Sequence, residues 1–226
     1  MPSQPAAHDV HRDTNSRSLA ARALGRGRAI STPLLERATD LQLGIDTCAP
    51  PLPSAAYRAV QRTPYEPLLY DVLSEMQRRL ALGSDDVLFD LGCGKGRVLC
   101  WFARSRHRAC VGIEFDPRLA DAARLNAEKL HRRRSPIEVR TEDAAETDFD
   151  QATAIVMYNP FGPELMGVVA RRLRDSLIRL PRKLVVAYAG PEQLAEFTAI
   201  DPIELTDDFE TPYYQGAIRT VIFQLG

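Results

Sequence analysis

The stretch from Val87 to Glu114 constrains the fold more than any other part of this 226-residue sequence. It begins with a short apolar run that ends in Asp90, continues through three glycines at alternate positions, and then takes on a helical pattern. A second apolar run ends in Glu114. Strand, glycine turn, helix and strand in this order, with an acid closing each strand, are typical of a nucleotide-type cofactor site in an α/β protein.

The glycines at positions 92, 94 and 96 make the turn suitable for a ligand. Because glycine has no Cβ, a ligand can lie against the backbone and the chain can turn tightly into a helix. The acid at the end of the second strand can accept hydrogen bonds from ribose hydroxyls. A glycine turn that serves only the packing of the fold is the less favoured alternative.

The spacing of these glycines argues against the dinucleotide fingerprint G-x-G-x-x-G, because Arg97 stands where that fingerprint has its third glycine. Asp90 and the three glycines instead resemble motif I of the class I S-adenosylmethionine-dependent methyltransferases, D/E-x-G-x-G-x-G. The resemblance covers roughly residues 60–226. It implies an α/β fold: a doubly wound, mostly parallel seven-stranded sheet with a C-terminal antiparallel hairpin.

The same resemblance implies S-adenosylmethionine as the cofactor and suggests which residues contact it. Asp90 would orient its methionine end, Glu114 would hold its ribose, and Asp143 would accept a hydrogen bond from the adenine amino group. The other cofactor contacts expected from these motifs are Gly92, Cys93, Gly94, Gly96 and Ala144.

The segment Thr63-Pro64-Tyr65-Glu66-Pro67 leads into an expected helix over about Leu68–Leu80. It resembles the corresponding segment of several protein-lysine methyltransferases and of bacterial relatives that share an LGIDT…PYEP pattern. In those proteins the segment closes over the methionine moiety, so Thr63 and Tyr65 become candidate cofactor contacts. A hydrophobic staple that fixes the start of the helix explains the segment equally well.

The segment Asn159-Pro160-Phe161-Gly162 follows an expected strand at Ala154–Tyr158. Ligands of doubly wound sheets bind beyond the carboxyl ends of the strands, and Asn159 offers both a carbonyl acceptor and an amide donor there. The segment resembles the N-P-P-[YF] loop of amino methyltransferases acting on adenine or glutamine. Phe161 replaces the second proline, so that specificity is not carried over. The candidate catalytic residues are Asn159, Tyr158 and Tyr65, and Asn159 is also a candidate cofactor contact.

The two ends of the chain carry weaker signals. Residues 1–30 read as a flexible tail, and residues 31–60 as a helix and a proline-rich connector, either a rigid linker or a segment laid across the domain. Residues 61–226 form the expected methyltransferase domain. The terminal hairpin is expected at about Ile203–Leu205 and Ala217–Gln224. The apolar residues of the expected N-terminal helix share one face: Leu34, Leu35, Ala38 and Leu41.

The aromatic stretch Asp207–Tyr214 reads as a loop between the two strands of that hairpin. It either lines a substrate pocket or packs on the sheet edge, and the second reading is slightly favoured.

Composition narrows the partners and the compartment. A net charge of −1 gives no global field for nucleic acid or membrane, and no apolar run approaches the ~20 residues of a membrane span. The four cysteines form no C-x-x-C pair and no histidine stands at ligand spacing, so no metal is expected. The sequence therefore predicts a cytoplasmic enzyme, a monomer or a homodimer.

The first expectation for the reaction is methyl transfer to nitrogen or oxygen of a small molecule, glycan or natural-product intermediate. The alternatives are a protein-lysine methyltransferase and a non-catalytic cofactor-binding module. The intact set of Asp90, Glu114, Asp143 and Asn159 argues against the module. Nucleic acid ranks last, because no groove of Lys and Arg interleaved with aromatics lies near Asn159.

Overall fold

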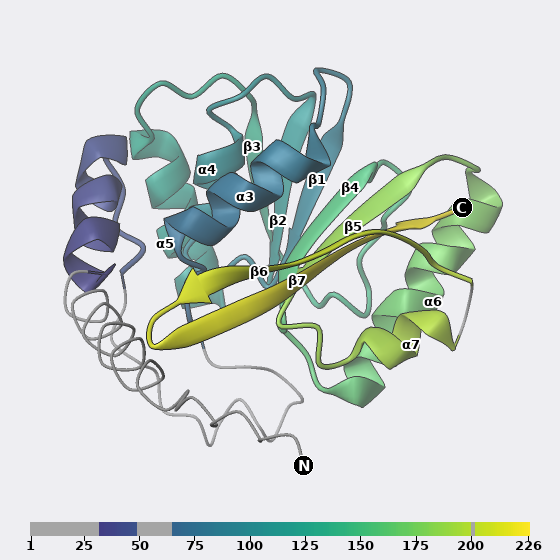
Figure 1. Cartoon of the computed structure of the whole chain (residues 1–226). Coiled ribbons are helices and arrows are strands. Elements are labelled where there is room, and N and C mark those ends of the chain that lie inside the picture. Colours follow the sequence, from purple (N-terminus) through teal and green to yellow (C-terminus); the bar gives the residue numbers. More distant parts are fainter. Residues whose placement is uncertain (1–31, 49–64, 200–201) are drawn as a thin grey trace, which may run out of the picture.

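The computed structural model describes residues 32–48, 65–199 and 202–226. Its sheet has seven strands in the order β3-β2-β1-β4-β5-β7-β6 (Figure 1). The first five strands in this order are parallel, and β7 runs antiparallel to both β5 and β6. The strands are β1 (Val87–Leu91), β2 (Ala109–Glu114), β3 (Ile137–Thr141), β4 (Ala154–Tyr158), β5 (Leu184–Ala189), β6 (Glu204–Tyr213) and β7 (Gly216–Leu225).

Helices cover both faces of the sheet, which explains why the central parallel strands are apolar except for Asp90 and Glu114. Leu73, Leu99 and Ala123 of α3, α4 and α5 share one buried cluster. Met166 and Phe197 of α6 and α7 share the other. Figure 1 shows these two groups on opposite sides of the sheet. The helices are α3 (Tyr70–Leu80), α4 (Arg97–Phe102), α5 (Pro117–Lys129), α6 (Pro163–Arg179) and α7 (Leu194–Thr198).

The mostly parallel sheet with its C-terminal antiparallel hairpin confirms the expected fold. The order of the strands reverses between β1 and β4, so a crevice opens beyond their carboxyl ends. The glycine turn follows β1 and the segment Asn159–Gly162 follows β4. The two motifs that were found separately in the sequence therefore flank the same crevice.

The expectation of a loop at Asp207–Tyr214 is wrong, because β6 continues to Tyr213. Phe209 and Thr211 alternate inward and are buried, and they pair with Thr220 and Ile218 of β7. Asp208 and Glu210 alternate with them and are exposed, which is why the stretch reads as polar.

The helix over residues 32–43 turns its apolar face outward. The side chains of Leu34, Leu35 and Leu41 are 70%, 63% and 72% exposed, while Asp40 on the inner face is 2% exposed. Residues 1–31 and 49–64, which contain the expected tail, Thr63 and most of the proline-rich connector, lie outside the described residues. Within the described ranges, no helix is long and apolar enough to cross a membrane.

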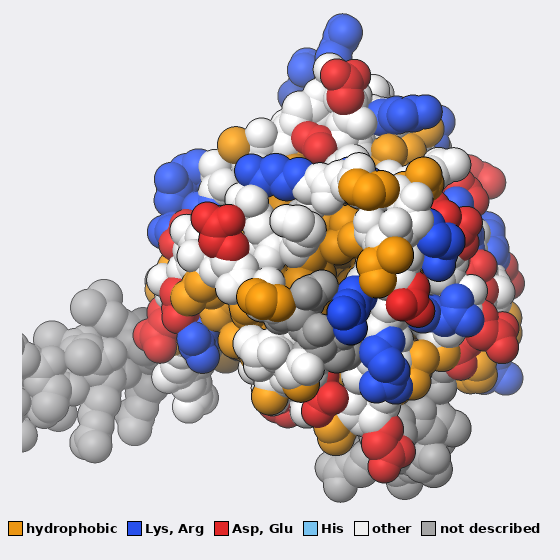
Figure 2. Space-filling model, turned by 90° about the vertical axis from the view of Figure 1, so that its right-hand side faces the viewer, with side chains coloured by type: hydrophobic (Ala, Val, Ile, Leu, Met, Phe, Trp, Pro, Cys, Tyr) orange, Lys and Arg blue, Asp and Glu red, His pale blue; other side chains and the backbone are white. Residues whose placement is uncertain are grey.

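Figure 2 shows one face of the molecule, on which apolar side chains gather around a central recess. Lysine, arginine, aspartate and glutamate side chains are interspersed around that recess. The described residues on this face therefore form no extended basic surface of the kind that neutralises a nucleic-acid backbone.

Candidate active site

The glycine turn is held to the neighbouring strand by its backbone. The amides of Gly92 and Cys93 donate to the carbonyl of Ile113 at 2.9 and 3.0 Å. Gly94 has a φ of +54°, and a Cβ there would lie 2.3 Å from the ring of Tyr65. A Cβ on Gly92 would lie 2.9 Å from Pro160. Both glycines are therefore required by the close approach of these side chains, and both line the cavity of the site.

Glu114 links the two turns that border the crevice. Its carboxylate accepts hydrogen bonds from the amide of Gly94 at 2.8 Å and from the amide of Asp116 at 2.9 Å. Burial raises the pKa of the Glu114 carboxyl. A carboxylate oxygen has two lone pairs and can accept two hydrogen bonds, so Glu114 retains capacity for the hydroxyls of a ribose.

Asp90 is the one charged side chain of β1, a strand buried at every position. Its Oδ2 has no hydrogen-bond partner among the described residues. Burial, followed by the nearby charge of Glu114, raises the pKa of this carboxyl well above its ordinary value. A buried polar atom without a partner is costly, so this oxygen fits a site completed by a hydrogen-bond donor from a ligand.

Asn159 begins the turn after β4 in a left-handed conformation, with a φ of +34°. Its backbone amide donates to the carbonyl of Ala189 at 3.2 Å, and its side-chain Oδ1 accepts from the hydroxyl of Tyr188 at 3.1 Å. Burial raises the pKa of Tyr188 to about 12, so the hydroxyl stays protonated and fixes the orientation of the Asn159 amide. Asn159 is thus a pre-oriented polar group at the carboxyl end of β4.

These elements enclose a cavity of about 440 Å³, within the usual range for a small-molecule site. The candidates that line it are Tyr65, Gly92, Gly94, Glu114, Ala144, Tyr158 and Asn159. Asp90, Cys93 and Gly96 are buried without being part of the lining. Asp143 stands between the lining residues Glu142 and Ala144 without being one of them. The Cys93 side chain packs on Gly112, where a Cβ would lie 2.7 Å from its sulfur.

The aromatic wall of the cavity is a feature that the motifs did not reveal. Tyr213, from the end of β6, donates a hydrogen bond to Glu66 at 2.8 Å. Its ring meets that of Tyr158 edge-on, with centroids 6.1 Å apart. Glu192, Ala217 and Ile218 complete this side of the lining. Glu66 had a signal in its proximity to Tyr65, whereas Tyr213 had only its place in an aromatic stretch.

Comparisons with known proteins agree with this geometry. Residues 90–191 match the family model described as the ANTKMT methyltransferase domain. A protein-lysine N-methyltransferase of Saccharolobus islandicus is 29% identical over 102 residues, which span 44% of this chain and 62% of the relative. The chain therefore aligns with less than two thirds of that relative.

Solved structures extend the likeness to most of the fold. An RNA methyltransferase from Salinibacter ruber in complex with S-adenosylhomocysteine superposes with a TM-score of 0.51 and 27% identity, over 70% of this chain and 92% of that one. The chain has the class I, Rossmann-like fold of the S-adenosylmethionine-dependent methyltransferases. A magnesium protoporphyrin IX methyltransferase from Synechocystis with bound S-adenosylmethionine shares the fold of this chain, at a TM-score of 0.51 and 14% identity over 69% of this chain and 76% of that one.

S-adenosylmethionine is the cofactor of proteins with this fold that match the chain, and the cavity fits it. The partnerless oxygen of Asp90, the glycine turn without side chains and the carboxylate of Glu114 all border or underlie one cavity. These features suit a ligand with a cationic end, a ribose and a planar base.

Proposed function

We propose that this protein is a protein-lysine methyltransferase, which transfers a methyl group from S-adenosylmethionine to the ε-amine of a lysine side chain. The match of residues 90–191 to the ANTKMT methyltransferase domain supports this acceptor, as does the resemblance to the Saccharolobus lysine methyltransferase. Both findings favour the lysine acceptor over the small molecule, glycan or natural product expected first from the sequence.

The observation that carries the proposal is the charge of the cavity. Its described lining contains four glutamates and no lysine, arginine or histidine: Glu66, Glu114, Glu142 and Glu192. Carboxylates in a partly enclosed space favour cations, because their attraction is less screened there than in bulk water. An acceptor that arrives as an ammonium fits such a lining, whereas a phosphate-rich acceptor does not.

The aromatic wall adds a second preference for a cation. The rings of Tyr158 and Tyr213 stand beside Glu66 at the lining, and ring faces attract ammonium groups. We therefore assign Glu66, Tyr158 and Tyr213 to the binding of the lysine ammonium. Asn159 would accept a hydrogen bond from the amine through the second lone pair of its carbonyl oxygen.

The chemical step needs alignment and a neutral amine rather than a strong base in the protein. When bound, S-adenosylmethionine supplies the methyl group on a sulfonium leaving group, so a nitrogen–carbon bond forms as the sulfur–carbon bond breaks. Burial raises the pKa of Tyr158 to about 12, so its hydroxyl is protonated near neutral pH and does not take the proton. The lysine proton leaves to water on the side of the exposed Glu66.

A labelled-methyl assay with the full chain tests the acceptor. We expect label from S-adenosylmethionine to enter lysine residues of a protein extract, as identified by mass spectrometry. The matched control is the same extract with its lysines acetylated beforehand, because the resulting amides have no nucleophilic amine and should take up no label. Purified RNA is assayed in parallel because the Salinibacter relative is an RNA methyltransferase. Label in RNA, or in a small-molecule fraction alone, would overturn the proposal.

Variants distinguish the residues proposed to bind the acceptor from those proposed to bind the cofactor. Glu66→Gln should raise the KM for the lysine acceptor while leaving the affinity for S-adenosylhomocysteine unchanged. Glu128→Gln, which removes an exposed carboxylate of α5, is the control. Asn159→Ala should lower turnover more than it lowers cofactor affinity. The reverse pattern at Asn159 would assign that residue to the cofactor instead of the acceptor.

A further inference from the structure

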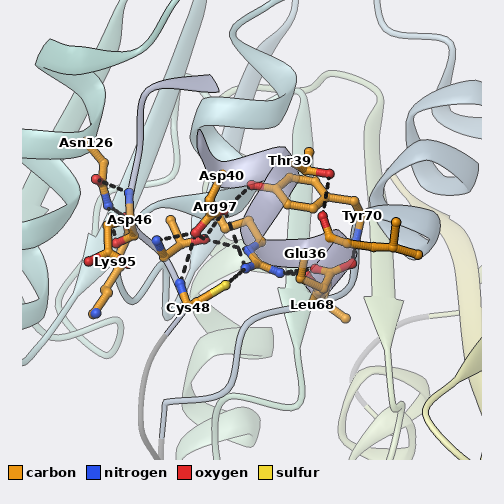
Figure 3. Close-up of polar contacts among 12 residues, drawn as sticks. Glu36, Thr39, Asp40, Asp46, Cys48, Leu68, Tyr70, Lys95, Arg97 and Asn126 are labelled. Atoms are coloured by element: carbon orange, nitrogen blue, oxygen red, sulfur yellow. Dashed lines mark hydrogen bonds and ion pairs between the residues drawn. The ribbon is translucent and has the colours of Figure 1, made fainter. Parts of the chain in front are cut away.

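The N-terminal strap, defined here as residues 32–48, lies against the glycine turn although it precedes it by some fifty residues. It consists of the helix over residues 32–43 and the short segment that follows. Its apolar contribution to the core is small, because only Leu43 and Ile45 join the buried cluster. The contacts that attach the strap are instead polar, and they converge on Arg97 and Asn126 (Figure 3).

Arg97 is the first residue of α4 and its side chain is 3% exposed. Its guanidinium pairs with Glu36 of the strap helix, and its Nε donates to the hydroxyl of Thr47 at 2.6 Å. It also donates to the carbonyl of Leu68 at 3.0 Å and lies 4.5 Å from the ring centroid of Tyr70. One side chain, placed directly after the glycine turn, thus joins the strap to the segment that leads into α3.

Asp40 closes the strap on itself. Its carboxylate accepts hydrogen bonds from the amides of Thr47 and Cys48, at 2.6 and 3.0 Å, and from the hydroxyls of Thr47 and Tyr70. It also lies 3.5 Å from a guanidinium nitrogen of Arg97. These donors compensate a carboxylate that is 2% exposed, and together they fix the position of the Thr47 backbone.

Asn126 of α5 ties the same segment to the glycine turn from the other side. Its side-chain carbonyl accepts from the amide of Asp46 at 2.9 Å. Its amide donates to the carbonyls of Asp46 and Lys95, at 3.1 and 2.9 Å. Lys95 lies within the glycine turn, so the strap and the turn share one buried side chain as a common anchor.

The position fixed in this way supports Tyr65. The hydroxyl of Tyr65 donates to the carbonyl of Thr47 at 2.6 Å, and its ring rests on Gly94. Tyr65 lines the cavity, whereas Asp40 and Thr47 are not among its lining residues. We propose that Asp40 is a positioning residue of the methyltransferase: through Thr47 it holds the Tyr65 ring against the glycine turn, and so sets cofactor affinity from outside the cavity. This inference does not depend on which acceptor is methylated.

Calorimetric titration of the full chain with S-adenosylhomocysteine tests the coupling in a double-mutant cycle. Tyr65→Phe removes the hydroxyl and keeps the ring, and Asp40→Asn weakens the support of Thr47. Each should lower the affinity about threefold to tenfold, the usual effect of one hydrogen bond. The double variant should bind no more weakly than the weaker single variant, because both changes break one linkage. Asp175→Asn, at an exposed carboxylate of α6, should leave the affinity unchanged.

Thermal unfolding without ligand separates positioning from a general loss of stability. Asp40→Asn should lower the Tm in both the native and the Tyr65→Phe backgrounds, but should lower the affinity only in the native one. Thr47→Val, which removes the hydroxyl and preserves the shape, replaces Asp40→Asn if that variant does not fold. Two results would overturn the proposal. One is an unchanged affinity in Asp40→Asn alone. The other is a loss of affinity in the double variant that equals the product of the fold losses in the two single variants.

Discussion

The glycine turn and the N-terminal strap meet at Arg97, but opposite forces hold them in place. The turn follows a strand that is buried at every position, and its backbone bonds to Ile113 of the next strand. The strap turns Leu34, Leu35 and Leu41 to solvent. Its carboxylates at Glu36 and Asp40 face inward, onto the buried guanidinium of Arg97. Apolar periodicity therefore identifies the core face in the first region and misidentifies it in the second.

This contrast predicts the largest loss of stability for a substitution at Arg97. Arg97→Met should lower the free energy of unfolding by about 3–5 kcal/mol, because Glu36 and Asp40 are left buried without their cation. Urea denaturation measures it. The reference is Leu99→Ala at a fully buried core leucine of α4, for which about 2–5 kcal/mol is expected. A loss at Arg97 below about 1 kcal/mol would break the contrast, since the strap would then need no polar anchor.

The next largest effect is expected on cofactor affinity, from the two acids beside the glycine turn. Asp90→Ala and Glu114→Ala should each weaken the binding of S-adenosylmethionine at least about tenfold, equivalent to about 1.4 kcal/mol, because each removes hydrogen bonds to a ligand in a buried site. Calorimetry with the purified variants checks the expectation, and NAD, which should not bind, is the control ligand. Unchanged affinity in both variants would refute the assignment of the cavity to the cofactor.

The same two carboxyls should also make the stability of the protein depend on pH, with an effect of intermediate size. Burial raises the pKa values of Glu114 and Asp90, so the native protein without cofactor binds these protons more tightly than the unfolded chain does. Their contribution to stability is present at low pH and is lost as the pH rises through the raised values.

Cofactor binding should show the opposite trend, because it needs the ionised carboxylates as acceptors. The affinity for S-adenosylhomocysteine should therefore fall on acidification, and it should begin to fall at a higher pH than the ordinary carboxyl range. Calorimetry at several pH values, with Glu114→Gln as the comparison, measures the contribution of this group. An identical pH profile in that variant would show that Glu114 is not responsible.

The smallest effect is expected on the outer face of the strap. Leu35 is 63% exposed, so Leu35→Ala should change the free energy of unfolding by no more than about 0.5 kcal/mol. The same denaturation experiment measures it beside Leu99→Ala. A loss of several kcal/mol would mean that this leucine is covered in solution, and the contrast between the two regions would then disappear.

The residues on the side of the cavity formed by the glycine turn could be picked out from the sequence because their signals are local. The acids and glycines from Asp90 to Glu114 lie at fixed spacings around one turn. Because β1 and β2 pair in parallel, the ends of both strands lie beside that turn. Asn159 was found for the same reason, since it directly follows β4 of the parallel sheet. The specific roles of these residues and of Tyr65 stay predictions.

The other half depends on distances that no local pattern encodes. Glu66 and Tyr213 are 147 residues apart, and their hydrogen bond exists because β6 is longer than its apolar residues suggest. The strap was missed for a different reason. Glu36 and Asp40 look like solvent-facing helix residues until Arg97 is seen to be buried beneath them.

The hairpin of β6 and β7 also has a consequence for biosynthesis. The glycine turn, Glu114 and Asn159 are all translated before residue 160, whereas Tyr213 and Ile218 come from the hairpin. Because β7 inserts between β5 and β6, a growing chain that has not reached residue 216 leaves β5 as an open sheet edge. The nascent protein thus completes its cofactor face before its aromatic wall, and a ribosome that stalls between the two leaves an edge prone to pair with other chains.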